Sequence, residues 1–225
     1  MSWIYRISMK MKLFLALMPL LIALCWFAGS GMLSRIQSEQ QMHTISQLTA
    51  LARSAGDVVH ELQRERGMSA GYLGAKGEQF RSELTAQQKI TDAALATFNN
   101  TLSATDSAIL TGDIAATVKI FNQHIQSLST TRTAIAGLSI DTPAAIQFYT
   151  QTISGVLNFV GGMGQLTTSG VMVNELAAYY SLLNLKEQAG VERALLSNIF
   201  SAGRFGDGQF RLFSDVVGKQ EAWLI

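Results

Sequence analysis

Hydrophobic residues recur along this chain at the three- and four-residue spacing of helices. Residues 13–33 carry no charge, and a run of about 20 apolar residues is long enough to cross a bilayer as a helix. Apolar positions then recur at helical spacing through residues 34–71, until Gly74-Ala75-Lys76-Gly77 interrupts them. No stretch shows the sustained alternation of a strand, so the pattern predicts an all-α fold.

Further along the chain, capping and breaking residues delimit five more expected helices. Asp113 and Gly137 are expected to cap one helix at its two ends. Asp141-Thr142-Pro143 predicts the start of the next, and the glycine-rich segment 161–164 is expected to break or kink it. The five expected helices cover residues 80–102, 113–137, 142–160, 171–202 and a segment from 209 onward. In the first of these, the expected core positions are Leu84, Ile90, Leu95 and Phe98.

The charges around the apolar run predict its orientation in a membrane. Arg6, Lys10 and Lys12 precede the run, and Arg35 is the nearest basic residue after it. The positive-inside rule then places residues 1–12 in the cytoplasm, 13–33 in the inner membrane and 34–225 in the periplasm. A cleaved signal peptide is the competing interpretation. The expected architecture is a membrane-anchored antiparallel helical bundle, and the absence of a second apolar span suggests the front part of a longer receptor.

Composition narrows the class of function. The formal net charge of the 225 residues is +1 and no basic patch stands out, so we expect no nucleic-acid partner. The sequence shows no nucleophile-base motif and no phosphate-binding glycine loop. The three histidines lack the spacing of metal ligands. We therefore expect neither an enzyme nor a cofactor or metal site.

Two arginines lie on apolar helical stripes and are the strongest candidates for a binding site. Arg66 shares a helical face with Val59, Leu62, Ser69 and Leu73. A second stripe carries Arg193, together with Leu185, Ala189, Leu196 and Phe200. A guanidinium does not lose its charge and is costly to bury alone. Each arginine therefore needs either a carboxylate or a bound anion.

The surroundings of the two arginines are similar enough to suggest an internal duplication. Glu65-Arg66 and Glu192-Arg193 are separated by 192 − 65 = 127 residues, and Gln-Phe-Arg follows each pair, at 79–81 and 209–211. Chance similarity between two amphipathic helices is the alternative. A true repeat with pseudo-twofold symmetry could bring Arg66 and Arg193 toward one ligand.

Small residues beside the arginines leave room for a small planar anion, which the guanidinium fork can hold through paired hydrogen bonds. Ser69 and Ser197 could add hydroxyl donors, and Arg64 is a weaker candidate on a more polar face. The competing interpretation is internal pairing. Neighbours in a helix do not face each other, so Glu65 would have to pair across helices. The carboxylates available for such pairing are Glu65, Glu187 and Glu192.

These same segments resemble the nitrate- and nitrite-sensing (NIT) domain. Residues 60–73, HELQRERGMSAGYL, are similar to its opening motif, and residues 186–194, KEQAGVERA, with Asn198-Ile199-Phe200 and Arg204-Phe205, to its second motif. Thr91-Asp92 sits where such domains often carry that pair. The resemblance covers residues 50–225. It implies an all-helical sensor that binds nitrate or nitrite through arginines between helices, and we carry this role to Arg66 and Arg193 first.

An anchor directly before such a domain is most similar to the chemoreceptors of the family. We therefore expect a periplasmic nitrate- or nitrite-sensing module of a transmembrane chemotaxis-type receptor, acting as a homodimer. The rival hypothesis is a membrane-anchored helical dimerisation or protein-interaction module without a ligand. Carboxylates that already fork both guanidiniums would favour the rival.

Overall fold

The structure is a computed structural model that describes residues 8–107, 109–110, 112–202, 204–206 and 208–224. All regular elements in these ranges are helices, which confirms the predicted all-α class. The chain divides into two units, residues 1–46 and 47–225. The first helix, α1 (Met9–Gly74), begins in the first unit and ends in the second.

The first unit contains the apolar part of α1. Its 24 residues Met9–Met32 have a mean hydropathy of 2.2, and none of this stretch is buried. Pro19 lies inside the helix. By length and composition the stretch could cross a membrane, and a signal sequence near an N-terminus has the same features.

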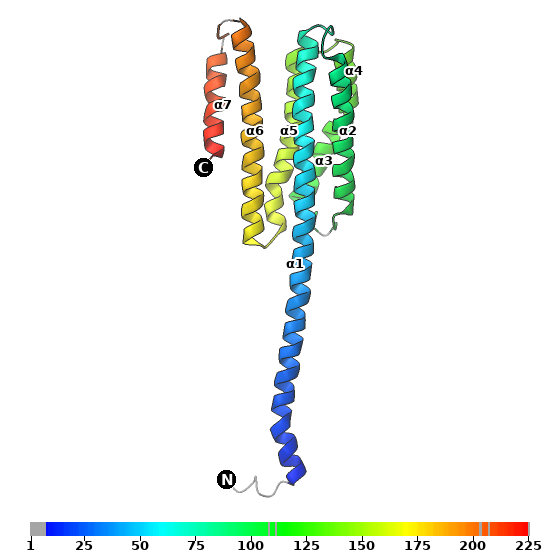
Figure 1. Ribbon diagram of the computed structural model, residues 1–225, viewed down its shortest axis with the longest axis vertical. Helices are drawn as coiled ribbons and strands as arrows, with labels where there is room; N and C mark the ends of the chain where they lie inside the picture. Colours follow the sequence, from blue (N-terminus) through cyan, green and yellow to red (C-terminus); the bar gives the residue numbers. More distant parts are fainter. Residues whose placement is uncertain (1–7, 108, 111, 203, 207, 225) are drawn as a thin grey trace. The chain divides into compact units, whose positions relative to one another are not determined.

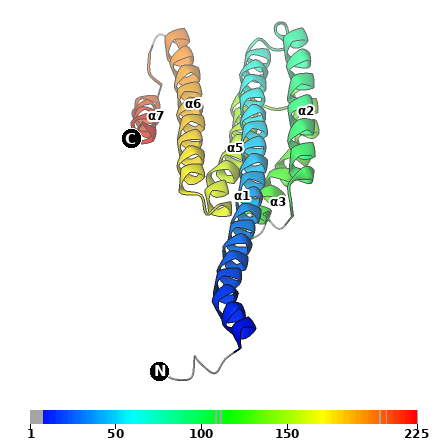
Figure 2. The same cartoon turned by 60° about the horizontal axis from the view of Figure 1, so that its bottom comes forward.

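The second unit is a bundle of helices around the end of α1 (Figure 1). Both views show α2 beside α1 and α7 beside α6 (Figures 1 and 2). The elements after α1 are α2 (Arg81–Ala104), α3 (Asp113–Gln126), α4 (Leu128–Ala136), α5 (Thr142–Gly162), the 3-10 helix η2 (Met163–Leu166), α6 (Gly170–Ala202) and α7 (Gln209–Trp223). An aromatic cluster lies in the core, where Phe98 packs edge-on against Phe121 at 5.6 Å and Phe159 at 5.7 Å between ring centroids.

Several of the predicted helix ends are confirmed. α1 ends at Gly74, and the turn after it contains left-handed residues at Lys76, Gly77 and Phe80. Asp141 caps α5, since its side chain accepts a hydrogen bond from the Ala144 N–H at 2.8 Å. α6 and α7 begin within a residue of their predicted starts.

The predicted helix 113–137 is wrong in its continuity, because it is two helices with a break at Ser127. In this segment Thr131 and Thr133 donate hydroxyl hydrogen bonds to the carbonyls of Ser127 and Ser129. Such bonds compete with the helical ladder, which accounts for a weak point here. The cap position of α3 is held by Gly112 rather than Asp113, whose side chain lies outside the described residues.

The glycine-rich segment 161–164 ends α5 as predicted, because the α-helix stops at Gly162 and the 3-10 helix η2 follows from Met163. Gly161 and Gly162, the last two residues of α5, lie in close contact with neighbouring helices. A β-carbon on Gly161 would lie 2.9 Å from the ring of Tyr180, and one on Gly162 would lie 2.6 Å from Ile114. In α2, Leu84, Leu95 and Phe98 are buried as predicted, whereas Ile90 is 45% exposed.

Candidate functional site

Arg66 belongs to α1 and contacts α5 and α6, and a carboxylate of α6 binds its guanidinium. Its Nη1 donates to Glu187 Oε1 at 2.5 Å and its Nη2 to Glu187 Oε2 at 3.1 Å, so the pair is bidentate. Nη1 also donates to the Thr150 hydroxyl on α5 at 2.9 Å. Arg66 is 8% exposed and Glu187 4%. The stripe around Arg66 therefore faces the core as predicted, since Val59, Leu62 and Ser69 are also buried.

The Glu187 carboxylate has a second partner on α1. Gln63 Nε2 donates to Glu187 Oε2 at 2.8 Å. On the α6 side the site is lined by Gly190, where an added β-carbon would lie 3.6 Å from Arg66 Nη2. This distance is an ordinary van der Waals contact, so Gly190 lies directly beside the guanidinium.

Arg193 is not part of the buried Arg66–Glu187 pair. Arg193 is exposed, as are Ala189 and Phe200 of its stripe, so the prediction that this stripe faces the core is wrong. The physical reason is that helical periodicity identifies an apolar face but not whether another element covers it. The two arginines differ in burial, since Arg66 is buried and Arg193 is exposed, and their expected convergence on one ligand stays a prediction.

The remaining predicted residues have different surroundings. Arg64 is exposed, and its Nη1 lies 3.7 Å from Glu61 Oε2 on the same helix. Ser69 is buried and donates to the Tyr149 hydroxyl at 3.4 Å. Ser197 belongs to α6, but its side chain lies outside the described residues.

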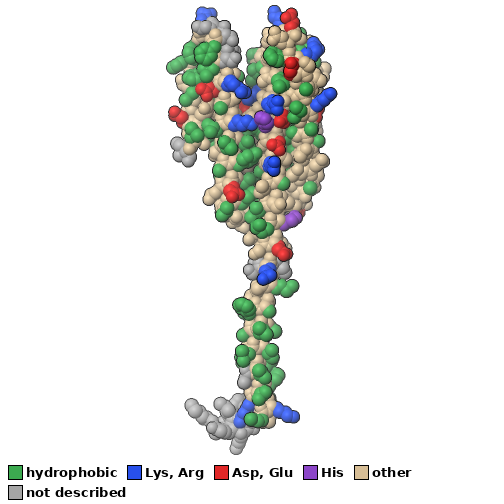
Figure 3. Space-filling view, viewed as in Figure 1, with side chains coloured by type: hydrophobic (Ala, Val, Ile, Leu, Met, Phe, Trp, Pro, Cys, Tyr) green, Lys and Arg blue, Asp and Glu red, His purple; other side chains and the backbone are tan. Residues whose placement is uncertain are grey.

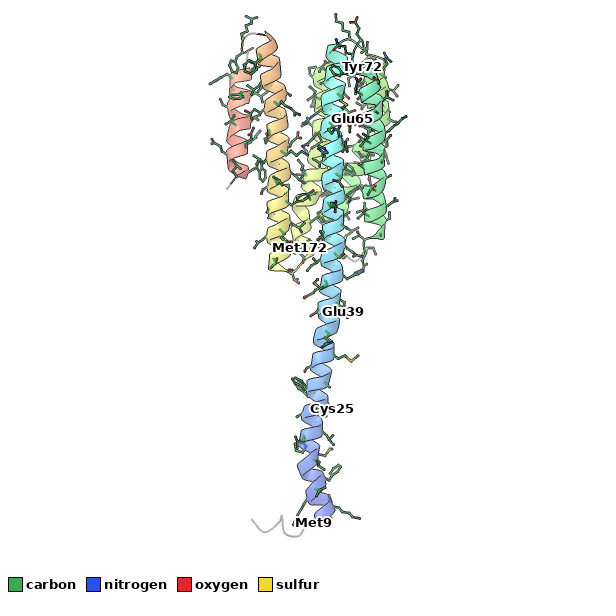
Figure 4. All side chains as sticks on the ribbon, in the orientation of Figure 1. Met9, Cys25, Glu39, Glu65, Tyr72 and Met172 are labelled. Carbon is green, nitrogen blue, oxygen red and sulfur yellow. The ribbon has the colours of Figure 1, made fainter. Side chains whose placement is uncertain are left out.

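A second buried ion pair lies beside the first and was not predicted as a pair. Glu65 is fully buried, on α1 two turns before Tyr72 (Figure 4). Arg132 of α4 donates two hydrogen bonds to its carboxylate, from Nε to Oε1 at 2.7 Å and from Nη2 to Oε2 at 2.9 Å. The Tyr149 hydroxyl donates to Oε1 at 2.8 Å. Arg132 also bonds Asp92 of α2 at 2.6 Å, so this network joins α1, α2, α4 and α5.

The charges of this network shift the pKa values of its members. Burial would lower the pKa of Arg132, but the hydrogen bonds and charges of Glu65 and Asp92 outweigh burial and raise it. Burial, followed by the negative charge of Glu65, raises the pKa of Tyr149. Arg132 is therefore permanently charged and Tyr149 is neutral, with its proton directed at Glu65.

The carboxylates proposed for internal pairing divide among different partners. Glu187 pairs with both terminal nitrogens of Arg66, and the rival hypothesis requires such a carboxylate partner for each of the two arginines. Glu65 pairs with Arg132 instead of Arg193, and Glu192 accepts a hydrogen bond from Gln220 of α7 at 2.6 Å. In the described part of the chain, the rival hypothesis is therefore met at Arg66 but not at Arg193.

Comparisons with known proteins identify relatives of this arrangement. The profile of a family described as "Nitrate and nitrite sensing" matches residues 57–224. A nitrate regulatory protein from Klebsiella oxytoca is 30% identical over 199 residues, which cover 87% of this chain and 48% of that protein. The solved structure of the NasR transcription antiterminator is similar with a TM-score of 0.78 and 27% identity, over 90% of this chain and 54% of that chain. The chain thus spans about half the length of both relatives.

These relatives correct part of the functional expectation. They are a nitrate regulatory protein and a transcription antiterminator, so the expected periplasmic module of a transmembrane chemotaxis receptor is wrong. The exclusion of nucleic acid as a partner also loses its support, because one relative acts in transcription antitermination. Apolar length and flanking charge misled the prediction, since they describe what a segment could do in a bilayer and carry no information about the output. Both relatives are regulators rather than enzymes.

Proposed function

The chain belongs to the nitrate and nitrite sensing family, and we propose that its helical bundle is the anion-sensing domain of a regulatory protein, with Arg66 as the primary ligand-binding residue. The observation that supports Arg66 is its occupied fork: a buried guanidinium already holds a planar, two-oxygen anion in the form of the Glu187 carboxylate. Nitrate and nitrite present the same pair of coplanar oxygens.

Residues around Arg66 complete the proposed site. Thr150 offers a hydroxyl 2.9 Å from Nη1, and Ser69 lies one helical turn further along α1. Arg193 lies on α6, one turn beyond Gly190, which lines the Arg66 site. We propose that Arg193 contributes long-range attraction for the anion from its exposed position, and that Arg64 and Ser197 are of lower rank.

Titration calorimetry of the full chain in detergent, with sodium nitrate as titrant and sodium chloride as control, tests this proposal. Arg66→Lys keeps the charge but loses the fork, so we expect nitrate affinity to fall by about tenfold or more. Arg211→Lys is the matched control, because Arg211 is exposed on α7. Nitrate binding that is equal in the wild-type chain and in Arg66→Lys would exclude Arg66. Arg193→Ala separates the roles: a weaker affinity that returns toward wild type with added salt indicates long-range attraction.

Anchoring of the apolar helix in a membrane is a separate proposal, and it rests on the unburied stretch Met9–Met32 alone. It assigns no side of the membrane to the sensing domain. Alkaline carbonate extraction of cells expressing the chain, with sequencing of the mature N-terminus, tests it. A chain that keeps Met9–Met32 and stays in the pellet supports anchoring. A soluble chain, or one that begins after this stretch, overturns it.

A further inference from the structure

We propose that Glu187 is an internal anion of the Arg66 site, and that nitrate or nitrite binds by displacing its carboxylate and thereby releasing α6 from α1. This inference rests on the proposed function, because it takes Arg66 to be the binding residue. Beyond the proposed function, it identifies Glu187 as the residue that sets the affinity and selectivity of the site. It also identifies α6 as the helix whose attachment to α1 changes on binding.

The geometry of the pair makes displacement necessary. Both terminal nitrogens of Arg66 are engaged, with Nη1 on Glu187 Oε1 and on Thr150, and Nη2 on Glu187 Oε2. An external anion that uses the same fork must take the place of both carboxylate oxygens. Nitrate and nitrite can do this because two of their oxygens lie in one plane at carboxylate-like spacing. Chloride, a single sphere, has no pair of oxygens to match the two nitrogens of the fork, so its two bonds cannot be parallel and competition with Glu187 selects against it.

Electrostatics also prevents the two anions from sharing the site. Arg66 and Glu187 are both more than nine-tenths buried, and a second negative charge beside one guanidinium would leave a buried charge uncompensated. The displaced carboxylate has other partners nearby. Gln63 donates to it at 2.8 Å from α1. Burial lowers the pKa of the adjacent Lys186, and the negative charges of Glu61 and Glu187 act against this, so its ammonium group attracts the Glu187 carboxylate.

The exchange has a mechanical consequence because its two partners lie on different helices. Arg66 and Gln63 belong to α1 and Glu187 to α6, so the pair is a bond between these helices. At the end of the bundle where α6 meets α7, the space-filling view shows a hollow between these two helices and the remainder, with Lys and Arg side chains at its walls (Figure 3). We infer that this hollow, with Lys and Arg side chains at its walls, is the entry for the anion. Release of Glu187 then frees α6 and the attached α7 to move as one piece.

Glu187→Gln is the decisive variant, since the amide keeps the size of the side chain and removes the competing charge. We expect nitrate to bind about tenfold more tightly to this variant than to the wild-type chain. The matched control is Glu192→Gln on the same helix, whose carboxylate bonds Gln220 and not an arginine. Its affinity for nitrate should equal that of the wild type. Glu187→Asp, a carboxylate one methylene shorter, keeps the charge and covers the case in which Glu187→Gln fails to fold. Because its carboxylate reaches less far toward the guanidinium, we expect an intermediate gain.

The outcomes separate this inference from the proposed function. Loss of nitrate binding in Arg66→Lys, with equal or weaker binding in Glu187→Gln, would keep the binding site and overturn the internal anion. Absence of nitrate binding in the wild-type chain and in Glu187→Gln would overturn both.

A distance measurement tests the release of α6 without altering the site. Spin labels on Gly67→Cys of α1 and Ala189→Cys of α6, both exposed, with Cys25→Ser, report the separation of the two helices. We expect the distance to increase on addition of nitrate and to stay constant with chloride. A distance that nitrate leaves unchanged would contradict the release of α6.

Discussion

Glu65 and Arg66 are consecutive on α1, yet they pair with opposite sides of the bundle: Glu65 with Arg132 of α4, and Arg66 with Glu187 of α6. Side chains of neighbouring helical residues point about 100° apart, which lets one dipeptide serve two interfaces. The Glu65 pair has three further contacts, to Tyr149, Asp92 and the Gln88 carbonyl. It therefore fixes α1 to the bundle, while the Arg66 pair is the one open to exchange.

Removal of the Glu65 charge is expected to destabilise the fold strongly. Glu65→Gln leaves the half-buried Arg132 without its main counter-charge, which costs about 3 kcal/mol of unfolding free energy. Urea unfolding followed by circular dichroism at 222 nm measures the loss. The matched control is Asp215→Asn, which removes the exposed pair with Lys219 at 2.8 Å and should cost less than about 1 kcal/mol. Equal losses of unfolding free energy in the two variants would show that the Glu65–Arg132 network does not hold α1 in the bundle.

The raised pKa of Tyr149 predicts a dependence of stability on alkaline pH. Burial and the Glu65 charge raise this pKa in the folded state above its ordinary value of about 10. The folded state then holds its proton where the unfolded state loses it. The resulting stabilisation is complete below pH of about 10 and falls as pH rises further. Tyr149→Phe lacks the ionisable hydroxyl and therefore this pH-dependent stabilisation. The difference in unfolding free energy between wild type and variant should narrow by about 1 kcal/mol between pH 8 and 11. A constant gap would contradict the shift.

The contact of α5 with α6 and α7 passes through a glycine and two aromatic rings. A β-carbon on Gly161 would lie 2.9 to 3.2 Å from ring atoms of Tyr180, whose ring packs edge-on against Trp223 at 5.3 Å. Gly161→Ala should cost about 1–3 kcal/mol and change the fluorescence of Trp223. Gly155→Ala is the matched control on the same helix, since nothing lies within 4 Å of its added carbon. It should be neutral or stabilising, by up to about 1 kcal/mol. Loss of stability in both variants would exclude crowding at Tyr180 as the cause.

The sequence could predict the helices and the burial of one of the two arginines, for identifiable reasons. Caps such as Asp141 act within a few residues of the chain, so their effect can be read locally. Arg66 was identifiable because its stripe carries other apolar residues that the bundle covers. Arg193 shows the limit, because its stripe has the same periodicity but Ala189, Arg193 and Phe200 on it are exposed. Arg132 was missed because its partner Glu65 lies 67 residues away and its own helix is short and rich in Ser and Thr.

Thr150 offers a test of the Arg66 site that leaves every charge in place. Its hydroxyl accepts the Nη1 proton that points away from Glu187, and Thr150→Val removes this acceptor without changing the shape of the side chain. A buried N–H without a partner costs about 1–3 kcal/mol, so we expect lower stability together with weaker nitrate binding.

Thr152→Val is the matched control for that variant, because the Thr152 hydroxyl donates only to the Phe148 carbonyl within α5. It should leave nitrate affinity unchanged in the same calorimetric titration, whereas Thr150→Ser should restore it. These expectations follow from the position of the Thr150 hydroxyl, which stays on the guanidinium whether the fork holds Glu187 or an external anion. If Thr150→Val and Thr152→Val bind nitrate equally well, the anion does not use the guanidinium that Thr150 supports, and the assignment of Arg66 fails with it.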